Sequence, residues 1–108
     1  MNKFNVEELK EFSHDKRVRK TLSKEGRFEM DLIFYEPNQS SPEHVHKHQD
    51  EIFYVVSGEG TMIINGKAIA VKEKDIILTP SGTTHGLIND SSSRLTLLFI
   101  KNKRPQNV

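Results

Sequence analysis

The sequence predicts an all-β fold with at most one short helix, and three observations support this. From residue 27 onward, short runs of β-branched, aromatic and aliphatic residues are separated by turn residues. No window in this part repeats its apolar residues with the period of an amphipathic helix. The dipeptide Asn65-Gly66 lies between two of the runs and is a strong signal for a tight β-hairpin, because a type I′ turn needs positive φ at both central residues.

The helix is expected near the N-terminus, and the strands follow it. Asn5 can cap a helix, and Glu8 stands three residues later, as in a capping box, ahead of Leu9. The first 26 residues are otherwise more polar than the rest and carry no strand signal. The expected strands are residues 27–35, 51–56, 60–64, 67–71, 75–78, 85–88 and 94–101.

Length and composition limit the protein to one domain without a global charge. The chain has 108 residues and a net charge of +1, so no overall field attracts nucleic acid or an anionic membrane. It contains no Cys, which excludes disulfides and thiolate ligands. The N-terminus has no signal-peptide pattern, and the longest apolar stretches, such as 95–100, are too short to span a bilayer. We expect a cytoplasmic protein that does not bind nucleic acid or membranes.

Some of the expected strands are apolar on both faces, which predicts cover on both sides. In the run at 52–56, Ile52, Tyr54 and Val56 alternate with Phe53 and Val55. The second cover would come from an opposing sheet, from the N-terminal segment or from another copy of the chain. A homodimer is therefore expected.

Two sequence motifs carry residues that bind metal ions. On an extended segment, His44 and His46 point to the same face, because strand side chains alternate. Imidazole and carboxylate together suit several divalent metals and can leave positions open for a substrate. The motifs read His44-x-His46-x4-Glu51-x6-Gly58 and Pro80-x-Gly82-x2-His85-x3-Asn89.

These motifs resemble the paired motifs of the cupin superfamily, whose members are small β-barrels of jelly-roll topology (a double-stranded β-helix). The resemblance covers residues 38–89 and departs at two turn positions, Asn38 and Lys74, where the family has Gly. Asn tolerates the left-handed conformation such turns often use, whereas Lys tolerates it less well, so a different turn geometry is expected before residue 75. Together with the run of expected strands, this predicts a barrel over 27–101 with 1–26 packed on it, and 102–108, which have no apolar periodicity, are expected to form a frayed tail.

The resemblance also implies that His44, His46, Glu51 and His85 bind one divalent ion, whether Fe, Mn, Ni, Zn or Cu. Burying these groups without partners would be costly, and a cation would compensate them. Two alternatives stay open, namely a hydrogen-bonded polar cluster without metal and a site that binds metal only adventitiously. The turn residues of the motifs receive structural roles: Gly58, Pro80, Gly82 and Asn89.

Other residues can be placed near the ion only in part. His48 continues the alternation of His44 and His46, but choosing it breaks the motif spacing, so it is interpreted as a solvent-side or substrate-facing loop residue. Strand parity places Phe53 with Glu51 and Leu87 with His85, either as lining of a substrate pocket or as plain core. No residue stands at a spacing that identifies a general base, and the catalytic residues stay unknown.

Two basic clusters flank the predicted strands. One contains Lys16, Arg17, Arg19 and Lys20, and the other contains Lys101, Lys103 and Arg104. Solvated surface charge is the ordinary interpretation of such clusters, and a patch for an anionic ligand is the alternative.

The resemblance implies a function but no single reaction. Cupins catalyse dioxygenation, decarboxylation, isomerisation and lyase reactions on organic acids, sugars and phenolics, and the ligands do not choose among them. We expect a metal-dependent enzyme in which the ion activates a small polar metabolite or dioxygen. The rival hypotheses are a non-catalytic module that binds or senses a small molecule and a structural or metal-storage role.

Overall fold

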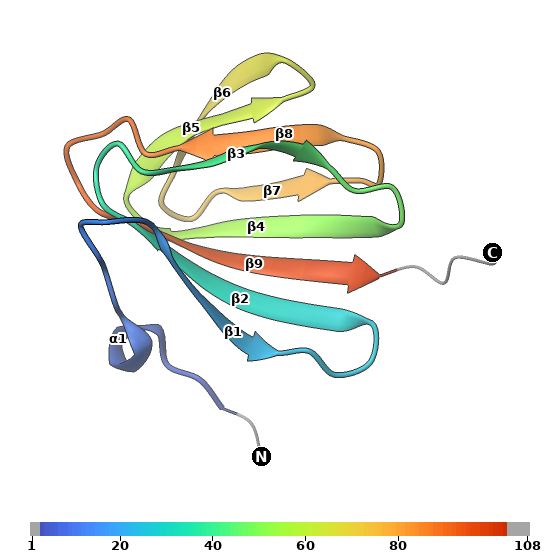
Figure 1. Ribbon diagram of the computed structural model, residues 1–108, viewed down its shortest axis with the longest axis horizontal. Helices are drawn as coiled ribbons and strands as arrows, with labels where there is room; N and C mark the ends of the chain where they lie inside the picture. Colours follow the sequence, from blue (N-terminus) through green and yellow to red (C-terminus); the bar gives the residue numbers. More distant parts are fainter. Residues whose placement is uncertain (1–2, 104–108) are drawn as a thin grey trace.

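The computed structural model describes residues 3–103, which form two antiparallel sheets facing each other around one core (Figure 1). One sheet has the strand order β1-β2-β9-β4-β7, and the other has the order β3-β8-β5-β6. The described elements are α1 (Val6–Leu9), β1 (Val18–Ser23), β2 (Phe28–Tyr35), β3 (Ser40–Val45), β4 (Gln49–Ser57), β5 (Glu59–Ile64), β6 (Lys67–Lys72), β7 (Ile76–Thr79), β8 (Thr84–Ile88) and β9 (Leu95–Lys103). The all-β jelly-roll prediction is confirmed.

Strand alternation fills the space between the sheets. In the central strands β2, β4 and β9, the odd-numbered side chains point inward, and they include Tyr35, Val55, Leu97 and Phe99. The register aligns these strands in rows, so that Phe99 pairs with Phe53 on one side and with Asp31 on the other. One face of three neighbouring strands therefore supplies most of the core.

The predicted helix cap and hairpin are both present. The backbone N–H of Glu8 donates a hydrogen bond to the Asn5 side chain at 3.2 Å, so Asn5 caps α1. Asn65 and Gly66 join β5 to β6 with φ values of 49° and 78°. These are the positive angles that a type I′ turn requires.

Two strands were not expected from the sequence, and both lie at a sheet edge. Strand β1 lies within the segment for which only a helix was expected, and each of its faces mixes a charged residue with others: Arg19 alternates with Thr21 and Ser23, and Lys20 stands between Val18 and Leu22. Strand β3 contains Pro42 and is largely exposed. Charged residues and Pro are common in edge strands, where one side needs no hydrogen-bonding partner, so neither segment carries the alternating apolar pattern.

The ends of the barrel strands differ from the expected bounds. Strand β9 continues to Lys103, so Asn102 and Lys103 are paired with neighbouring strands instead of frayed. The rest of the expected tail, 104–108, lies outside the described residues. At the other end of the chain, the Phe12 ring packs edge-on against Phe34 at 5.3 Å between centroids, on the outer face of β2.

The turn at Lys74 corrects one expectation. Lys74 has a φ of 75° and Asn38 has a φ of 72°, so both adopt the left-handed conformation. The turn before residue 75 therefore has the left-handed residue that such turns often use, although this residue is Lys and not Gly. The backbone N–H of Lys74 donates to the Val55 carbonyl at 2.8 Å, and the neighbouring strand thereby holds the conformation.

The helical content of the described residues is confined to short segments near the N-terminus. Within residues 3–103, no helix has the length and apolar character needed to cross a membrane.

Gly58 and Gly82 allow a test of how the fold uses left-handed glycines. They have similar φ values, 89° and 84°, but a Cβ on Gly58 would lie 2.3 Å from the Arg94 carbonyl oxygen, whereas a Cβ on Gly82 would meet nothing within 4 Å. We expect Gly58→Ala to lower the free energy of unfolding by about 3 kcal/mol or more, from strain plus a backbone clash. Urea denaturation of the variant and the wild type measures this change in the free energy of unfolding.

The matched control is Gly82→Ala, which adds the same methyl group in the same backbone conformation and should cost only about 1 to 2 kcal/mol. Equal losses for the two variants would mean that the close approach of Gly58 to the 94–95 backbone does not limit stability.

Candidate metal centre

Three potential metal-binding side chains meet inside one end of the barrel. His44 comes from β3, His85 from β8 and Glu51 from β4, and one donor atom of each lies within 4.8 Å of the others. His44 and His85 are direct partners in the register of β3 and β8, whereas Glu51 reaches them from the opposite sheet. The jelly-roll topology therefore brings together residues that are up to 41 positions apart in the chain.

Backbone carbonyls orient two of the imidazole rings. Nδ1 of His44 lies 2.9 Å from the carbonyl oxygen of Pro42, and Nδ1 of His85 lies 3.1 Å from that of Thr83. A carbonyl oxygen can only accept, so both Nδ1 atoms carry the hydrogen. Nε2 is then the nitrogen that each neutral ring can offer to an ion. This is the usual arrangement of histidines at metal sites.

His85 and Glu51 form a buried pair. Nε2 of His85 lies 3.1 Å from Oε1 of Glu51, and both side chains are 2% exposed. The two atoms are close but not aligned as a hydrogen bond, so Nε2 has no hydrogen-bonding partner among the described residues. A buried, basic nitrogen without a hydrogen bond, beside a carboxylate, is an arrangement that a shared cation would complete.

The pair shifts the proton affinity of both groups. Burial acts to raise the pKa of Glu51, but the contact with His85 and the positive charges of His85 and His46 outweigh it and lower the pKa. Burial acts to lower the pKa of His85, and the Glu51 contact, helped by the Thr83 carbonyl, outweighs it and raises the pKa. Without an ion, the charged pair is therefore favoured over the neutral one.

His46 lies next to this group but is not one of the three. Its ring centroid is 4.7 Å from that of His44 and 6.4 Å from that of His85. Burial lowers its pKa, which favours the neutral form that can bind an ion. The backbone N–H of Gly82 donates to the His46 carbonyl at 2.9 Å, so the second motif's turn fixes the backbone at His46.

The remaining histidines lie away from the cluster. His48 is exposed in the turn between β3 and β4. His14 is exposed as well, and its Nδ1 lies 3.2 Å from a carboxylate oxygen of Glu36. Neither is among the residues brought together at the candidate site.

Two of the three grouped side chains, His44 and His85, line a small cavity. Its free volume is about 20 Å³, room for one water-sized group. Phe53 and Leu87, the two residues expected beside the ion, both line it. The Phe53 ring lies edge-on to the His85 ring at 5.5 Å between centroids. Together they provide an apolar wall next to the polar cluster.

Sequence analysis missed several residues that line the same cavity. Tyr35 could not be placed from the sequence, yet it is buried here and its hydroxyl lies 2.8 Å from the Ser41 hydroxyl. Burial raises the pKa of Tyr35, so it stays protonated. Arg19 also lines the cavity, although its cluster was interpreted as surface charge. Only the pairing of β1 with β2 could have revealed that Arg19 lies at the cavity, because this pairing places Arg19 beside Ile33, which also lines it.

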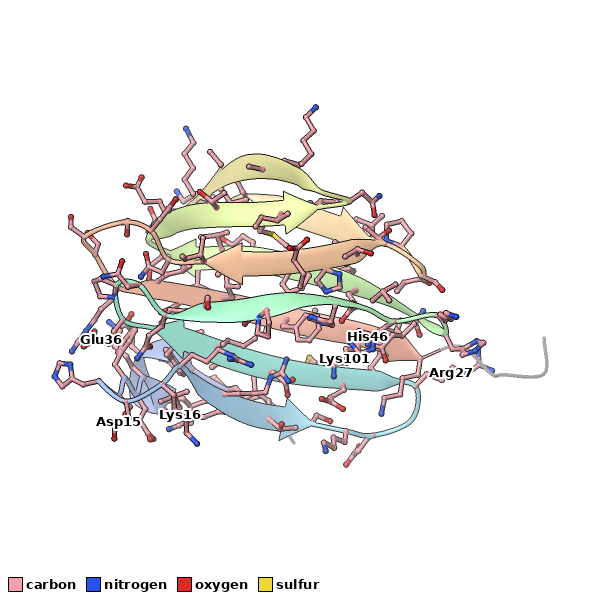
Figure 2. The ribbon with its side chains drawn as sticks, turned by 45° about the horizontal axis from the view of Figure 1, so that its top comes forward. Asp15, Lys16, Arg27, Glu36, His46 and Lys101 are labelled. Atoms are coloured by element: carbon pink, nitrogen blue, oxygen red, sulfur yellow. The ribbon has the colours of Figure 1, made fainter. Side chains whose placement is uncertain are left out.

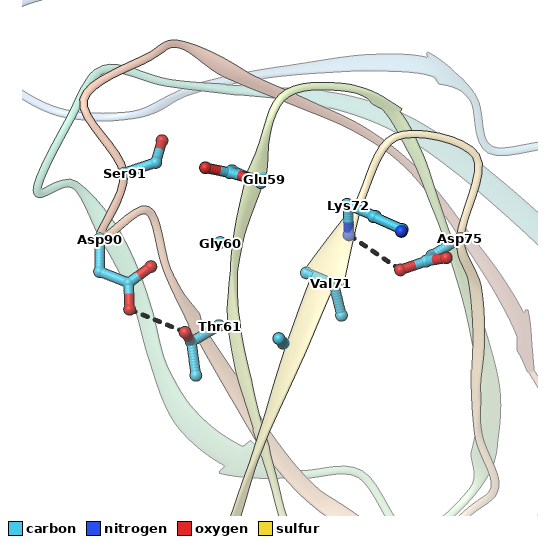
Figure 3. Close-up of a pocket in the computed structure, with 9 residues that line it drawn as sticks. Glu59, Gly60, Thr61, Val71, Lys72, Asp75, Asp90 and Ser91 are labelled. Carbon is cyan, nitrogen blue, oxygen red and sulfur yellow. Dashed lines mark hydrogen bonds between the residues drawn. The ribbon is translucent and has the colours of Figure 1, made fainter.

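A wider hollow of about 470 Å³ lies at the other end of the barrel (Figure 3). Its side chains are held by local contacts, including a 2.7 Å hydrogen bond from Thr61 to Asp90 and a 2.8 Å bond from the Lys72 backbone to Asp75. No histidine lines it. The candidate centre is therefore at the end where β3, β4 and β8 bring His44, Glu51 and His85 together.

The donor set fits a divalent transition metal. Two imidazole nitrogens and one carboxylate oxygen lie close enough to bind one ion, and the His46 ring lies beside that of His44. The orientation of Nδ1 in two rings and the unpartnered Nε2 of His85 support this fit independently of the sequence motifs.

Comparisons with known proteins agree with the fold and the motifs. The oxalate-binding protein of Thermotoga maritima is 34% identical over 64 residues, which are 59% of this chain and 53% of that protein. The chain thus spans about half the length of this curated relative. A solved structure from Thermus thermophilus matches with a TM-score of 0.90 at 25% identity, over 97% of this chain and 100% of that one. A predicted oxalate decarboxylase of Thermotoga maritima matches with a TM-score of 0.78 at 25% identity, over 81% and 80% of the two chains.

The family assignment rests on a match to a family model. The family model of the cupin domain matches residues 31–101, which include both motifs and the strands from β3 to β8. Because the match covers more than half of the chain, and because the neighbouring structures share its two-sheet architecture, the chain belongs to the cupin family.

Proposed function

We propose that this cupin holds one divalent ion with His44, His46, Glu51 and His85 and uses it to activate a small organic acid. The observation that carries the proposal is the convergence of His44, Glu51 and His85, with the Nδ1 atoms of both rings turned away from the common point. The ion would be Fe, Mn, Ni, Zn or Cu, because imidazole and carboxylate ligands suit all of these.

The bound ion would supply Lewis-acid chemistry toward a carboxylate or carbonyl oxygen, or a position for dioxygen. The chain's own residues have separate tasks. The carbonyls of Pro42 and Thr83 keep the two imidazoles in the binding tautomer. Phe53 and Leu87 exclude water from one side of the site and thereby strengthen its electrostatic interactions.

An organic acid is favoured over a sugar or a phenolic compound. The cavity beside the cluster is small, which argues against a ligand as large as a sugar or a phenolic compound. Two of the similar proteins are named for oxalate, one as a binding protein and one as a predicted decarboxylase. Oxalate is therefore the first compound to test here.

A non-catalytic binding or sensing role is the second candidate, and the name of the oxalate-binding relative favours it. Both candidates use the same ion and the same cavity. Incubation of the metal-loaded protein with oxalate and related acids separates them, since only an enzyme converts the acid to product over many turnovers.

A homodimer is proposed from the exposed face of the larger sheet. The outward side chains of β2, β4 and β7 include Phe28, Ile52, Ile76 and Leu78, which are 58%, 39%, 71% and 62% exposed. An apolar area of this kind on one face is typical of a protein–protein contact. A cytoplasmic location also stays a prediction.

Metal content of single variants tests the ligand set. Protein purified without an affinity tag or chelator should contain about one equivalent of a divalent metal per chain, measured by elemental mass spectrometry. Replacement of His46 by Ala should remove the stoichiometric metal. Iron would direct the search toward dioxygen chemistry, and Mn, Ni or Zn toward isomerase, lyase or decarboxylase reactions.

The matched control is His48→Ala, which removes an exposed imidazole two residues further along and should leave metal content unchanged. If His46→Ala keeps a full equivalent, or if His48→Ala loses it, the ligand set is wrong.

The His85–Glu51 pair predicts how stability depends on pH without metal. A histidine with a raised pKa stabilises the fold at low pH, and this contribution disappears as the pH rises through the folded pKa. The Glu51 contribution, from a lowered pKa, disappears only at acidic pH. The free energy of unfolding of metal-free protein should therefore fall as the pH rises from about 6.5, the ordinary pKa of His, through the raised pKa of His85.

Glu51→Gln should flatten this decline, because it removes the charge that raises the pKa of His85. Metal affinity of the wild type should rise over the same range, since an ion must displace the proton from His85. Urea denaturation of chelator-treated protein measures the first effect. A metal-free protein whose stability rises over this range would contradict the assignment.

Replacement of Leu78 by Glu tests the proposed dimer. A charge on the exposed apolar face should convert a dimer to a monomer, seen by size-exclusion chromatography with light scattering. Ala70→Glu is the control, since it adds the same charge at an exposed position of the other sheet. A wild-type protein that is already monomeric would contradict the proposal.

A further inference from the structure

The hairpin turn at Asn65-Gly66 contacts the strand that carries His85. Strand β5 pairs with β8 up to the pair Ile64 and His85, and the next residue, Asn65, leaves the sheet with a φ of 49°. In Figure 1 this turn lies at the end of the barrel where β8 begins, and Figure 2 labels His46 at the same end. The turn therefore meets β8 beside the candidate metal centre.

Asn65 forms two hydrogen bonds with Thr84. Its backbone N–H donates to the Thr84 carbonyl at 2.8 Å, and its side-chain Oδ1 accepts from the Thr84 N–H at 3.0 Å. The first bond continues the ladder between β5 and β8. The second replaces a backbone acceptor that β5 no longer supplies, because the chain turns away at this residue. One residue thus holds both peptide groups that flank Thr84.

One of these peptide groups also contacts the ring of His85. The Thr84 N–H and the Thr83 carbonyl belong to the same planar peptide group. That carbonyl accepts the hydrogen of His85 Nδ1 at 3.1 Å. A continuous chain of hydrogen bonds therefore runs from Asn65 Oδ1 through one rigid peptide to the imidazole. The other ring nitrogen, Nε2, is the buried atom that lies 3.1 Å from Glu51 and has no aligned hydrogen bond.

This chain of hydrogen bonds acts on His85 in two ways. Fixing the peptide plane fixes the direction of the Thr83 carbonyl and, through it, the orientation of the ring. A hydrogen bond accepted from the N–H end of a peptide also polarises the carbonyl at the other end, because linked hydrogen bonds strengthen one another. A more strongly held Nδ1–H makes Nε2 a better electron-pair donor toward an ion.

The Asn65 side chain is the replaceable member of three successive anchors before His85. The N–H groups of Gly82 and Thr83 donate to backbone carbonyls, at 2.9 Å and 3.0 Å. The N–H of Thr84 donates instead to a side chain. A substitution at position 65 therefore removes one anchor and leaves the other two in place.

We propose that Asn65 is a positioning residue for the metal centre and acts on His85 through the peptide group between Thr83 and Thr84. The inference rests on the proposed function, because it concerns a ligand of the proposed ion. It gives an exposed turn residue a role that the hairpin alone does not require, since Gly or Asp at this position would also form the turn.

The test varies the side chain at position 65 while the turn is kept. Gly, Asn and Asp all tolerate positive φ, but Gly has no side-chain acceptor, Asn has a neutral one and Asp has a charged one. Zn²⁺ is the probe, because imidazole and carboxylate ligands suit it. Its affinity is measured by competition with a chromophoric chelator, under conditions in which circular dichroism shows every variant to be folded.

The affinity for Zn²⁺ should follow the strength of the acceptor. Asn65→Gly should weaken binding by about threefold or more, as expected for the loss of one hydrogen bond that supports a metal ligand. Asn65→Asp should bind Zn²⁺ at least as tightly as the wild type, because a carboxylate is the stronger acceptor. This rescue distinguishes positioning from a merely structural role, since all three side chains form the same turn.

Two controls separate the hydrogen bond from turn strain and from charge. Gly66→Ala strains the same turn, where Gly66 has a φ of 78°, but keeps the Asn65 side chain, so the affinity for Zn²⁺ should not change. Gly66→Asp in the Asn65→Gly background adds a negative charge one residue further along, away from the position that faces Thr84. This double variant should stay as weak as Asn65→Gly.

The outcomes separate this inference from the function on which it rests. A wild-type protein that binds no stoichiometric Zn²⁺ would overturn both. If the wild type binds Zn²⁺ and Asn65→Gly loses less than about threefold in affinity, Asn65 has no positioning role, while the metal centre stands. The inference also fails if Asn65→Asp is as weak as Asn65→Gly, if Gly66→Ala loses as much affinity, or if the added charge at position 66 restores it.

Discussion

The buried contact between His85 and Glu51 is the interaction on which the candidate site depends. It joins the two sheets through buried polar side chains, with 3.1 Å between the nearest atoms. Removing such groups from water is costly, and their mutual attraction repays only part of that cost. A divalent ion held by both groups would remove most of the remaining penalty. The incompletely compensated burial of His85 and Glu51 therefore disfavours the metal-free site and favours the binding of an ion.

Strand register divides the barrel interior into two halves with different tasks. Toward one end, the inward side chains are apolar, as at Val55, Leu95 and Leu97, and none of these is exposed. Four to six residues away on the same strands, the inward positions are occupied by charged groups, including Glu51 and Lys101. Because alternation is not interrupted, apolar and polar halves share the same strands. Burial in the first half stabilises the fold while the second half exposes groups that can bind ligands.

The sequence predicted the central strands because their inward faces are apolar and their turns are chemically distinctive. Asn65-Gly66 is the clearest case, since few other dipeptides adopt positive φ at both positions. The sequence did not predict β1 and β3. Both are edge strands with charged residues or Pro and therefore lack the alternating signal. Lys74 shows a further limit. A hydrogen bond to a neighbouring strand keeps it in a left-handed conformation that its residue type disfavours.

By itself, the sequence determined the fold class and the hairpin, because side-chain alternation and turn chemistry are local properties, and the resemblance of its two motifs to those of the cupins indicated the candidate metal ligands. The tertiary structure decided which faces meet. Arg19, Asp31 and Lys101 come from three strands, and nothing in their local sequence distinguishes them from surface charges. Their convergence over Phe99 depends on the register between strands that are distant in the chain. Register is set by packing of the whole barrel, so periodicity along one strand cannot reveal it.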